Sequence, residues 1–202
     1  MRMSVRSQNP KLGRPRTGGS RERILDAALQ LFAERGFHGV AMPDLAAVAG
    51  IAAATIYRHF TGKEALVNEL YQRCKALLVQ RLEAQLLSTA PLRERFHELW
   101  WTLVRFAREE SRTFAFLELH HHGDYLNAQS RAIELDALLP IATLLEKGRA
   151  AGIIKDLPPA PLIVTVWGAF VGMNKAARLG YFELTDELCA QVEETCWDAI
   201  AV

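Results

Sequence analysis

The sequence contains only three cysteines, and it lacks any apolar run long enough to cross a membrane. Cys74, Cys189 and Cys196 are odd in number and scattered, which argues against a disulfide framework and fits a reducing compartment. A membrane helix needs about 20 consecutive apolar residues, whereas the longest such stretch, residues 160–173, is shorter and contains Pro161. The first residues are basic but lack the apolar core of a secretory signal. We therefore expect a cytoplasmic protein with buried, unpaired cysteines and no membrane partner.

Motifs that carry catalytic or metal chemistry are also absent. The sequence has no nucleophile elbow, phosphate-binding loop, zinc-protease motif or spaced Cys/His cluster, so we predict no enzyme activity, no cofactor and no metal. The alternative, a helical enzyme or metal-dependent binding protein, depends on the histidine run 120–122, with His97 and Glu118 as further candidate ligands. Adjacent helical residues point about 100° apart, so three consecutive histidines face one ion only where a helix ends. We favour histidines that end a helix and interact with its dipole.

The net charge of +1 hides an uneven distribution. Residues 1–63 carry ten Lys and Arg against four Asp and Glu, a net charge of +6. Residues 64–202 carry fourteen against nineteen, a net charge of −5. A basic end on an acidic body indicates that the N-terminal segment contacts a polyanion and that the rest does not.

Helical periodicity runs through the chain, while strand alternation and hairpin turns are nearly absent. The first helix illustrates the pattern: Ser20 is placed to cap it, one face is apolar, and Gly36 follows its end. We predict an all-α fold of about nine helices, three short ones first. The expected ranges are about 21–35, 43–49, 52–59, 63–89, 91–110, 112–121, 124–148, 159–180 and 185–200.

Two of the short helices form a recognisable pair. The segment PDLAAVAG predicts one helix, with Leu45, Val48 and Ala49 facing inward. A tight turn at Gly50-Ile51 follows, and AAATIYRHF predicts the next helix. Two short helices joined by a turn of three or four residues with a glycine are typical of a helix-turn-helix, whose second helix enters the major groove of DNA.

Residues 21–70 resemble the DNA-binding domain of the tetracycline-repressor (TetR) family. The matching positions are Ile24, Leu25, Ala27, Ala28, Leu31, Phe32, Gly36, Phe37, Leu45, Ala46, Ala49, Gly50, Thr55, Tyr57, His59, Phe60, Lys63, Glu64 and Leu66. The resemblance implies a flexible basic arm over residues 1–19 and a DNA-binding domain over 20–66, with the helix-turn-helix at about 41–60. Residues 67–202 would then form a larger helical domain for effector binding and dimerisation.

The resemblance also implies which residues bind DNA. Tyr57 and Thr55 of the recognition helix would contact DNA, and Lys63 and His59 would contact phosphate, with packing at the helix end as the alternative for His59. Arg58 is not required by the family pattern, and it would either add a charge near DNA or remain solvated. The family pattern usually has hydroxyl residues before the second helix and at the start of the third. This chain departs from it, and the DNA-binding candidates at these two places are Met42, Ala52, Ala53 and Ala54.

The departures shift DNA binding toward other contacts. We expect fewer polar base contacts, methyl contacts from Ala53 or Ala54 to thymine, and more weight on DNA shape. Gly13-Arg14-Pro15-Arg16 in the arm resembles the core of an AT-hook, in which Arg14 and Arg16 would enter a narrow A·T minor groove. The bland alternative is an ordinary basic tail.

In the family the last two helices of each subunit make a four-helix dimer interface. The expected interface residues are Leu162, Val166, Trp167, Phe170, Leu188, Val192, Cys196 and Trp197. The alternative is that these residues form the internal core of a monomer. An aromatic concentration in the middle helices predicts an effector pocket for an apolar or aromatic ligand, although each residue taken singly fits core packing equally well. The expected pocket residues are Trp100, Trp101, Phe106, Phe114, Phe116, His120, Tyr125 and Met173.

These observations predict a homodimeric regulator that binds a double-stranded DNA operator and is released by a small-molecule effector. Motion of the long helix that begins near Lys63 would change the separation of the two recognition helices. A purely architectural nucleic-acid binder is a further alternative, which the acidic body makes less attractive.

Overall fold

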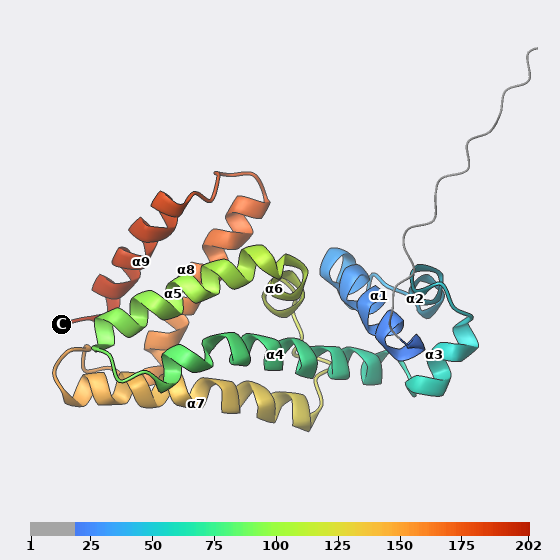
Figure 1. The fold of residues 1–202 in the computed structure, drawn as a ribbon, viewed down its shortest axis with the longest axis horizontal. Coiled ribbons are helices and arrows are strands. Elements are labelled where there is room, and N and C mark those ends of the chain that lie inside the picture. Colours follow the sequence, from blue (N-terminus) through green and yellow to red (C-terminus); the bar gives the residue numbers. More distant parts are fainter. Residues whose placement is uncertain (1–18) are drawn as a thin grey trace, which may run out of the picture.

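The computed structural model describes residues 19–202, and every regular element among them is a helix (Figure 1). This confirms the predicted all-α fold. The helices are α1 (Ser20–Arg35), α2 (Met42–Ala49), α3 (Ala53–His59), α4 (Lys63–Leu87), α5 (Leu92–Glu109), α6 (Ser111–Glu118), α7 (Ala128–Ala150), α8 (Pro159–Arg178) and α9 (Asp186–Ile200). Strand-like pairing over the same residues is limited to one antiparallel bridge between Ile154 and Ala201. None of the described helices is long and apolar enough to cross a membrane.

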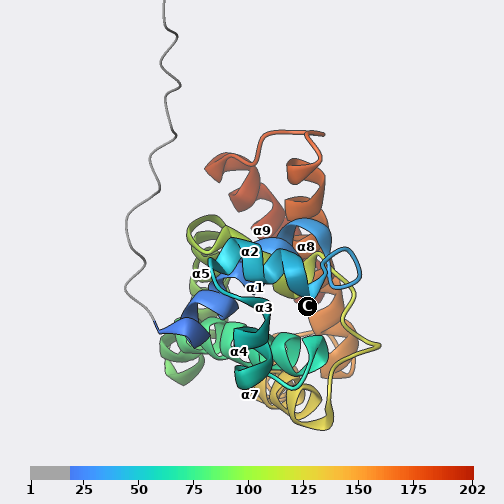
Figure 2. The same cartoon turned by 90° about the vertical axis from the view of Figure 1, so that its right-hand side faces the viewer.

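The molecule is elongated, with α1, α2 and α3 gathered at one end and α5 to α9 at the other (Figure 1). Helix α4 begins beside α3 and runs into the larger group, where it packs against α5 and α7. Figure 2 looks onto the small end, with α2 and α3 in front of the remaining helices. The arrangement therefore presents α2 and α3 to an outside partner while α4 connects them to the body.

Local chemistry sets the ends of the first helices. Gly36 and Gly50 follow α1 and α2 with φ of 67° and 65°, a conformation that costs glycine little. Helix α2 has no hydroxyl cap, but the Asp44 carboxylate accepts a hydrogen bond from the Ala41 N–H at 3.1 Å. Ser20 is not the cap of α1 as expected; Gly19 holds that position, and the Ser20 hydroxyl shares a 2.6 Å hydrogen bond with His59 Nε2.

Helix α7 begins at Ala128, four residues later than predicted. The buried side chain of Asn68 on α4 holds the preceding loop in place by accepting from the Asn127 N–H and donating to the Tyr125 carbonyl, both at 2.8 Å. The Asn127 side chain then caps α7 by accepting from the Ser130 N–H at 2.9 Å. These partners lie far apart in sequence, so periodicity gave no sign of the loop.

One continuous apolar core joins the two ends of the molecule. Buried side chains from α1 to α6 and from α8 and α9 belong to a single cluster, while a smaller one surrounds Ile154. The prediction that Val48 faces inward is wrong: it is 37% exposed, because Leu45 and Ala49 already fill the inner face of this short helix. The three cysteines are buried and unpaired, as expected, and burial raises the pKa of the Cys74 thiol to about 12.

The packing at the far end of α7 yields a stability prediction. A Cβ on Gly148 would overlap Leu92 and would lie 2.7 Å from Ile154 Cγ1. We expect Gly148→Val to lower the free energy of unfolding by about 1–3 kcal/mol, because overpacking outweighs the gain in helix propensity. The matched control is Ala150→Val, at an exposed position on the same helix. Urea denaturation measures both, and equal stability of the two variants would contradict the packing argument.

Candidate DNA interface and ligand cavity

Helix α3 presents a small, exposed surface at the end of the molecule. Ile56 and Phe60 anchor it in the core, with 0% and 4% of their surfaces exposed. This leaves the opposite face to solvent: Tyr57 is 56% exposed, and Arg58 is also exposed. The remaining exposed positions at the start of the helix are Ala52, Ala53 and Ala54. The face is therefore nearly free of polar side chains in its first turn and has a phenol and a guanidinium in its second.

Other predicted DNA-binding residues are partly buried or already in contact with side chains of this protein. Thr55 and His59 are half-buried, and His59 is bonded to Ser20. The Lys63 ammonium lies 4.3 Å from the centre of the Phe37 ring, and burial lowers the pKa of this lysine. The predicted contact Met42 packs against the core, while Arg14 and Arg16 lie outside the described residues.

Ion pairs and a stacking contact fix the small end to α4. Arg21 on α1 pairs with Glu69 on α4 at 2.5 Å, and Arg73 on α4 pairs with Glu22 at 2.7 Å. The Arg21 guanidinium also lies 5.3 Å from the centre of the Phe60 ring, directly after α3. Together with the packing of α1 against α4, these contacts connect the small end of the molecule to α4.

The body contains an apolar cavity of about 110 Å³. Its lining includes three tryptophans and no ionisable side chain. The lining residues are Leu82, Leu92, Phe96, Leu99, Trp100, Leu103, Ile141, Leu144, Leu145, Ile154, Leu162, Ile163, Val166, Trp167, Trp197 and Ile200. The indole N–H of Trp100 is directed to the Cys189 carbonyl at 3.0 Å, and that of Trp167 to the Glu118 carboxylate at 3.0 Å. Neither of these two groups offers a hydrogen bond to a molecule inside.

The cavity uses only one of the predicted pocket residues, Trp100. The other large apolar candidates are buried in the core instead: Phe106, Phe114, Phe116 and Met173. The predicted aromatic residues are divided between two places: Trp100 on α5 lines the cavity with residues of α7 and α8, while Phe114 and Phe116 on α6 pack inside the main core.

The remaining pocket candidates have polar or junction roles. Trp101 donates its indole N–H to Glu193 at 3.1 Å. His120 donates a hydrogen bond from Nε2 to the carbonyl oxygen of Ala33 in α1, at 3.0 Å, because a carbonyl oxygen can only accept. Tyr125 stacks on Phe37 with ring centres 4.1 Å apart. These three residues therefore connect helices rather than line the cavity.

The predicted dimer residues on α8 and α9 fall into three groups. Leu162 and Phe170, with Cys196 on α9, are buried in the chain's own core, so a partner chain would not meet them. The cavity lining takes a second group, Val166, Trp167 and Trp197. The other two predicted interface residues are partly exposed: Val192 packs against the edge of the main core, and Leu188 belongs to neither the core nor the cavity lining.

On the exposed face of α8, Val164 was not among the residues predicted from the sequence. Val164 is 70% exposed, and Gly168 and Gly172 follow it at intervals of four, with no atom near a Cβ built on either glycine. The spacing of these glycines was the signal that could have identified Val164, because residues four apart share a helix face.

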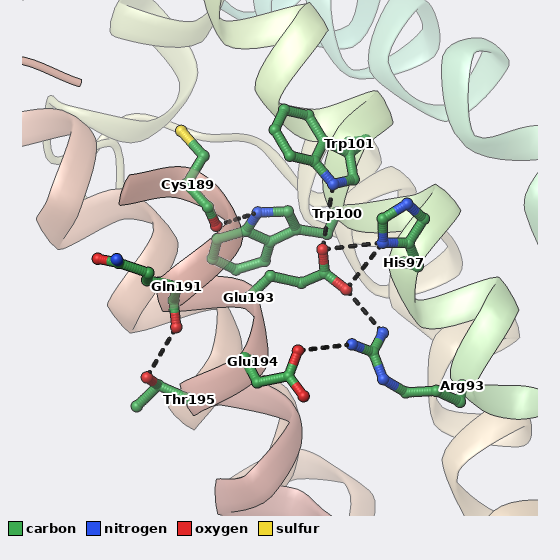
Figure 3. A network of polar contacts seen from close by, with 9 residues as sticks. All are labelled: Arg93, His97, Trp100, Trp101, Cys189, Gln191, Glu193, Glu194 and Thr195. Carbon is green, nitrogen blue, oxygen red and sulfur yellow. Dashed lines mark hydrogen bonds and ion pairs between the residues drawn. The ribbon is translucent and has the colours of Figure 1, made fainter. Parts of the chain in front are cut away.

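A buried carboxylate joins α5 to α9 (Figure 3). Glu193 is 3% exposed and accepts from Arg93 at 2.6 Å, His97 Nδ1 at 3.0 Å and Trp101 at 3.1 Å. Figure 3 shows the three donors on α5 converging on the one carboxylate of α9. Removing one donor from a buried carboxylate destabilises the protein, because the charge is left without a partner. The network therefore fixes α9 against α5.

The three histidines of residues 120–122 lie in three different environments. His120 lies against α1, His121 is exposed, and His122 is buried between the Phe116 carbonyl, 2.5 Å from Nε2, and the Tyr125 hydroxyl, 2.7 Å from Nδ1. Among residues 19–202 no three His, Cys, Asp or Glu side chains are grouped to hold a metal ion. The run therefore joins α1, α6 and the loop before α7.

Comparisons with known families cover residues 24–202. Residues 24–70 match the family described as bacterial regulatory proteins, tetR family, and residues 71–202 match the description tetracyclin repressor-like, C-terminal domain. An HTH-type transcriptional regulator of Haemophilus influenzae is 24% identical over 179 residues, which are 89% of this chain and 94% of that protein.

Solved structures show the same arrangement of helices. A putative TetR-family regulator from Vibrio parahaemolyticus has a TM-score of 0.71 and 30% identity, covering 91% of this chain and all of that one. The regulator FadR from Bacillus subtilis, in complex with stearoyl-CoA, has a TM-score of 0.69 and 20% identity over 87% and 96% of the two chains.

The surroundings of His122 predict an acid-sensitive fold. Burial lowers its pKa, so below about pH 6.5 the unfolded chain binds a proton that the folded chain resists. We expect the free energy of unfolding to fall as the pH decreases from 7 to 5, by at most about 1.4 kcal/mol per pH unit from this residue. His122→Gln should make the dependence shallower, while His121→Gln, the exposed neighbour, should leave it unchanged. Denaturation across this pH range measures the slopes, and a wild-type slope in His122→Gln would contradict the assignment.

Proposed function

Because the chain belongs to the tetR family of bacterial regulatory proteins, we propose that this DNA-binding transcriptional regulator is a repressor. It binds its operator as a homodimer and leaves it when a small apolar effector enters the body. One observation carries the proposal: α4 begins directly after α3, is ion-paired to α1, against which α3 packs, and contributes Leu82 to the apolar cavity near its other end. We further propose that the protein acts in the cytoplasm, where bacterial DNA lies, and has no catalytic role.

The composition of α3 supports an unusual way of reading DNA. Ala53 and Ala54 have methyl groups that fit against thymine methyls in the major groove, and they have no hydrogen-bonding group for other base edges. Tyr57 and Arg58 are exposed for phosphate contacts, with Thr55 beside them. Specificity then depends on the deformability of the operator and on the arm, where Arg14 and Arg16 would enter an A·T minor groove.

His59, Lys63 and Met42 would support rather than lead this contact. The bond to Ser20 holds His59 at the end of α3, and the Phe37 ring positions the Lys63 ammonium at the start of α4. A helix N-terminus with a nearby cation suits a phosphate group. Met42 begins α2 and packs against the core, while Ala52 is exposed directly before α3, so both would shape the surface beside the DNA backbone.

The outer face of α8 supports the homodimer. Val164, Gly168 and Gly172 form a strip of apolar and small surface that lets a second helix approach closely. A dimer places two recognition helices on half-sites about one DNA turn apart, about 34–36 Å. The partly exposed Leu188 and Val192 on α9 would extend the same interface.

The cavity indicates the class of effector. Its lining has no charge, and the indole N–H groups of Trp100 and Trp167 are bonded elsewhere, so an uncharged, weakly polar molecule or an acyl or aromatic group fits best. The stearoyl chain of the ligand in the structurally similar FadR has this character. The volume of about 110 Å³ is below the roughly 300–1,000 Å³ of ordinary ligand pockets, so the cavity must widen to admit the effector.

A titration against the upstream region of its own gene tests the repressor. We expect this fragment to bind about 10³-fold or more tightly than a scrambled one, and both to weaken with salt. Arg58→Ala should reduce affinity for both fragments and lower the salt dependence, since a phosphate contact is lost. Arg178→Ala, at an exposed position of the body, is the control and should change neither. Equal binding of the two fragments by the wild type would refute sequence-specific repression at this site.

A charge on α8 tests the dimer. Val164→Asp should convert the dimer to monomer and weaken operator binding, because it places two carboxylates in an apolar interface. Leu135→Asp is the matched control, since Leu135 on α7 is 66% exposed against 70% for Val164. Sedimentation velocity distinguishes the species. A Val164→Asp protein that remains dimeric would place the interface elsewhere.

A further inference from the structure

Trp167 belongs to two sites at once. Its ring lines the apolar cavity, and its indole N–H donates to Glu118 Oε2 at 3.0 Å. It also stacks on Phe170, with ring centres 5.8 Å apart. A molecule that enters the cavity must press on this ring, and the direction of the N–H fixes which group responds first.

That group, Glu118, is the last residue of α6, and its other oxygen pairs with Lys75 Nζ on α4 at 3.3 Å. Only 11% of each of these two side chains is exposed. A carboxylate at this depth depends on its donors, because water is scarce to replace them. Any displacement of the indole therefore changes the position of the Glu118 carboxylate and the strength of its ion pair with Lys75.

Both ends of this contact reach the DNA-binding helices. Lys75 lies on α4, whose first turns are tied to α1 by the Arg21–Glu69 and Arg73–Glu22 pairs. On the other side, His120, two residues after Glu118, donates to the carbonyl of Ala33 in α1. The position of Glu118 is therefore coupled to α4 and to α1, and α1 packs directly against α3.

We propose that Trp167, Glu118 and Lys75 form the bridge through which the cavity controls DNA binding. The bridge holds α6 and α4 in the arrangement that fits the operator, and a ligand that displaces the Trp167 indole releases it. The inference rests on the proposed repressor function and assigns Trp167 as a positioning residue, since it acts on DNA only through Glu118 and α4.

The chain supplies a matched control for this bond. Trp101 also donates its indole N–H to a poorly exposed glutamate, Glu193, at 3.1 Å. That hydrogen bond joins α5 to α9, and neither of these helices belongs to the DNA-binding group α1 to α3 or follows it directly in the chain. Trp167→Phe and Trp101→Phe therefore remove the same chemical group and keep an aromatic ring, but only the first interrupts the bridge.

The experiment compares these variants without any effector. We expect Trp167→Phe to bind the upstream fragment about ten-fold or more weakly, the scale of a lost hydrogen bond to a charged group, while Trp101→Phe stays near the wild type. Lys75→Met should lose affinity in the same way, and Lys75→Arg should restore it by keeping the ion pair. Urea denaturation checks that the two phenylalanine variants are similarly stable.

Hydrogen exchange of the free protein gives a readout that needs no operator. Trp167→Phe should speed exchange in α6 and in the first turns of α4, and Trp101→Phe should not. If the two variants match in both exchange and affinity, the bridge is wrong even where the wild type represses. If the wild type binds no DNA selectively, the repressor proposal fails, and faster exchange confined to Trp167→Phe still supports the bridge between the cavity and α4.

Discussion

The structure depends on α4 being part of two packed groups at once. Its first turns are tied to α1 by ion pairs, and its later turns pack with α5 and α7 around the cavity. A helix of 25 residues is a stiff rod about 37 Å long. Because closely packed interiors transmit strain rather than absorb it, a shift at the cavity end of α4 becomes a shift at α3. The main apolar cluster contains buried residues from α1 to α6 and from α8 and α9, so both ends of the molecule share one core.

Two buried carboxylates divide the body by function. Glu193 has its donors on α5 alone and fastens α9, so it serves the frame of the body. Glu118 has donors on α8 and α4, two helices that must move differently if the cavity controls DNA binding. Both carboxylates bind an indole and a cation. The partners of Glu193 share one helix, so that site holds two helices together, whereas the partners of Glu118 lie on two helices, so that site can couple the movement of one helix to the other.

The sequence predicted what depends on neighbours along the chain. Helix positions followed from periodicity and from the breaks at Gly36 and Gly50, and the helix-turn-helix followed from the tight turn at Gly50-Ile51 between two short helices. The cavity did not, because its lining joins residues from Leu82 to Ile200. On α8 the pattern could not tell the buried face from the free one, since Leu162 and Val164 are equally apolar. The choice between them is made by helices distant in sequence.

The small size of the cavity bears on how sensitive the regulator is. A space of about 110 Å³ is smaller than ordinary ligand pockets, so under the proposed function the state that binds effector is a minor population of the free protein. The apparent dissociation constant is then the intrinsic one divided by the fraction of molecules that are open. Sensitivity is therefore set by how tightly the empty cavity is packed as much as by contacts with the ligand. Substitutions among its apolar side chains can retune the response threshold without touching either the effector's recognition or the DNA.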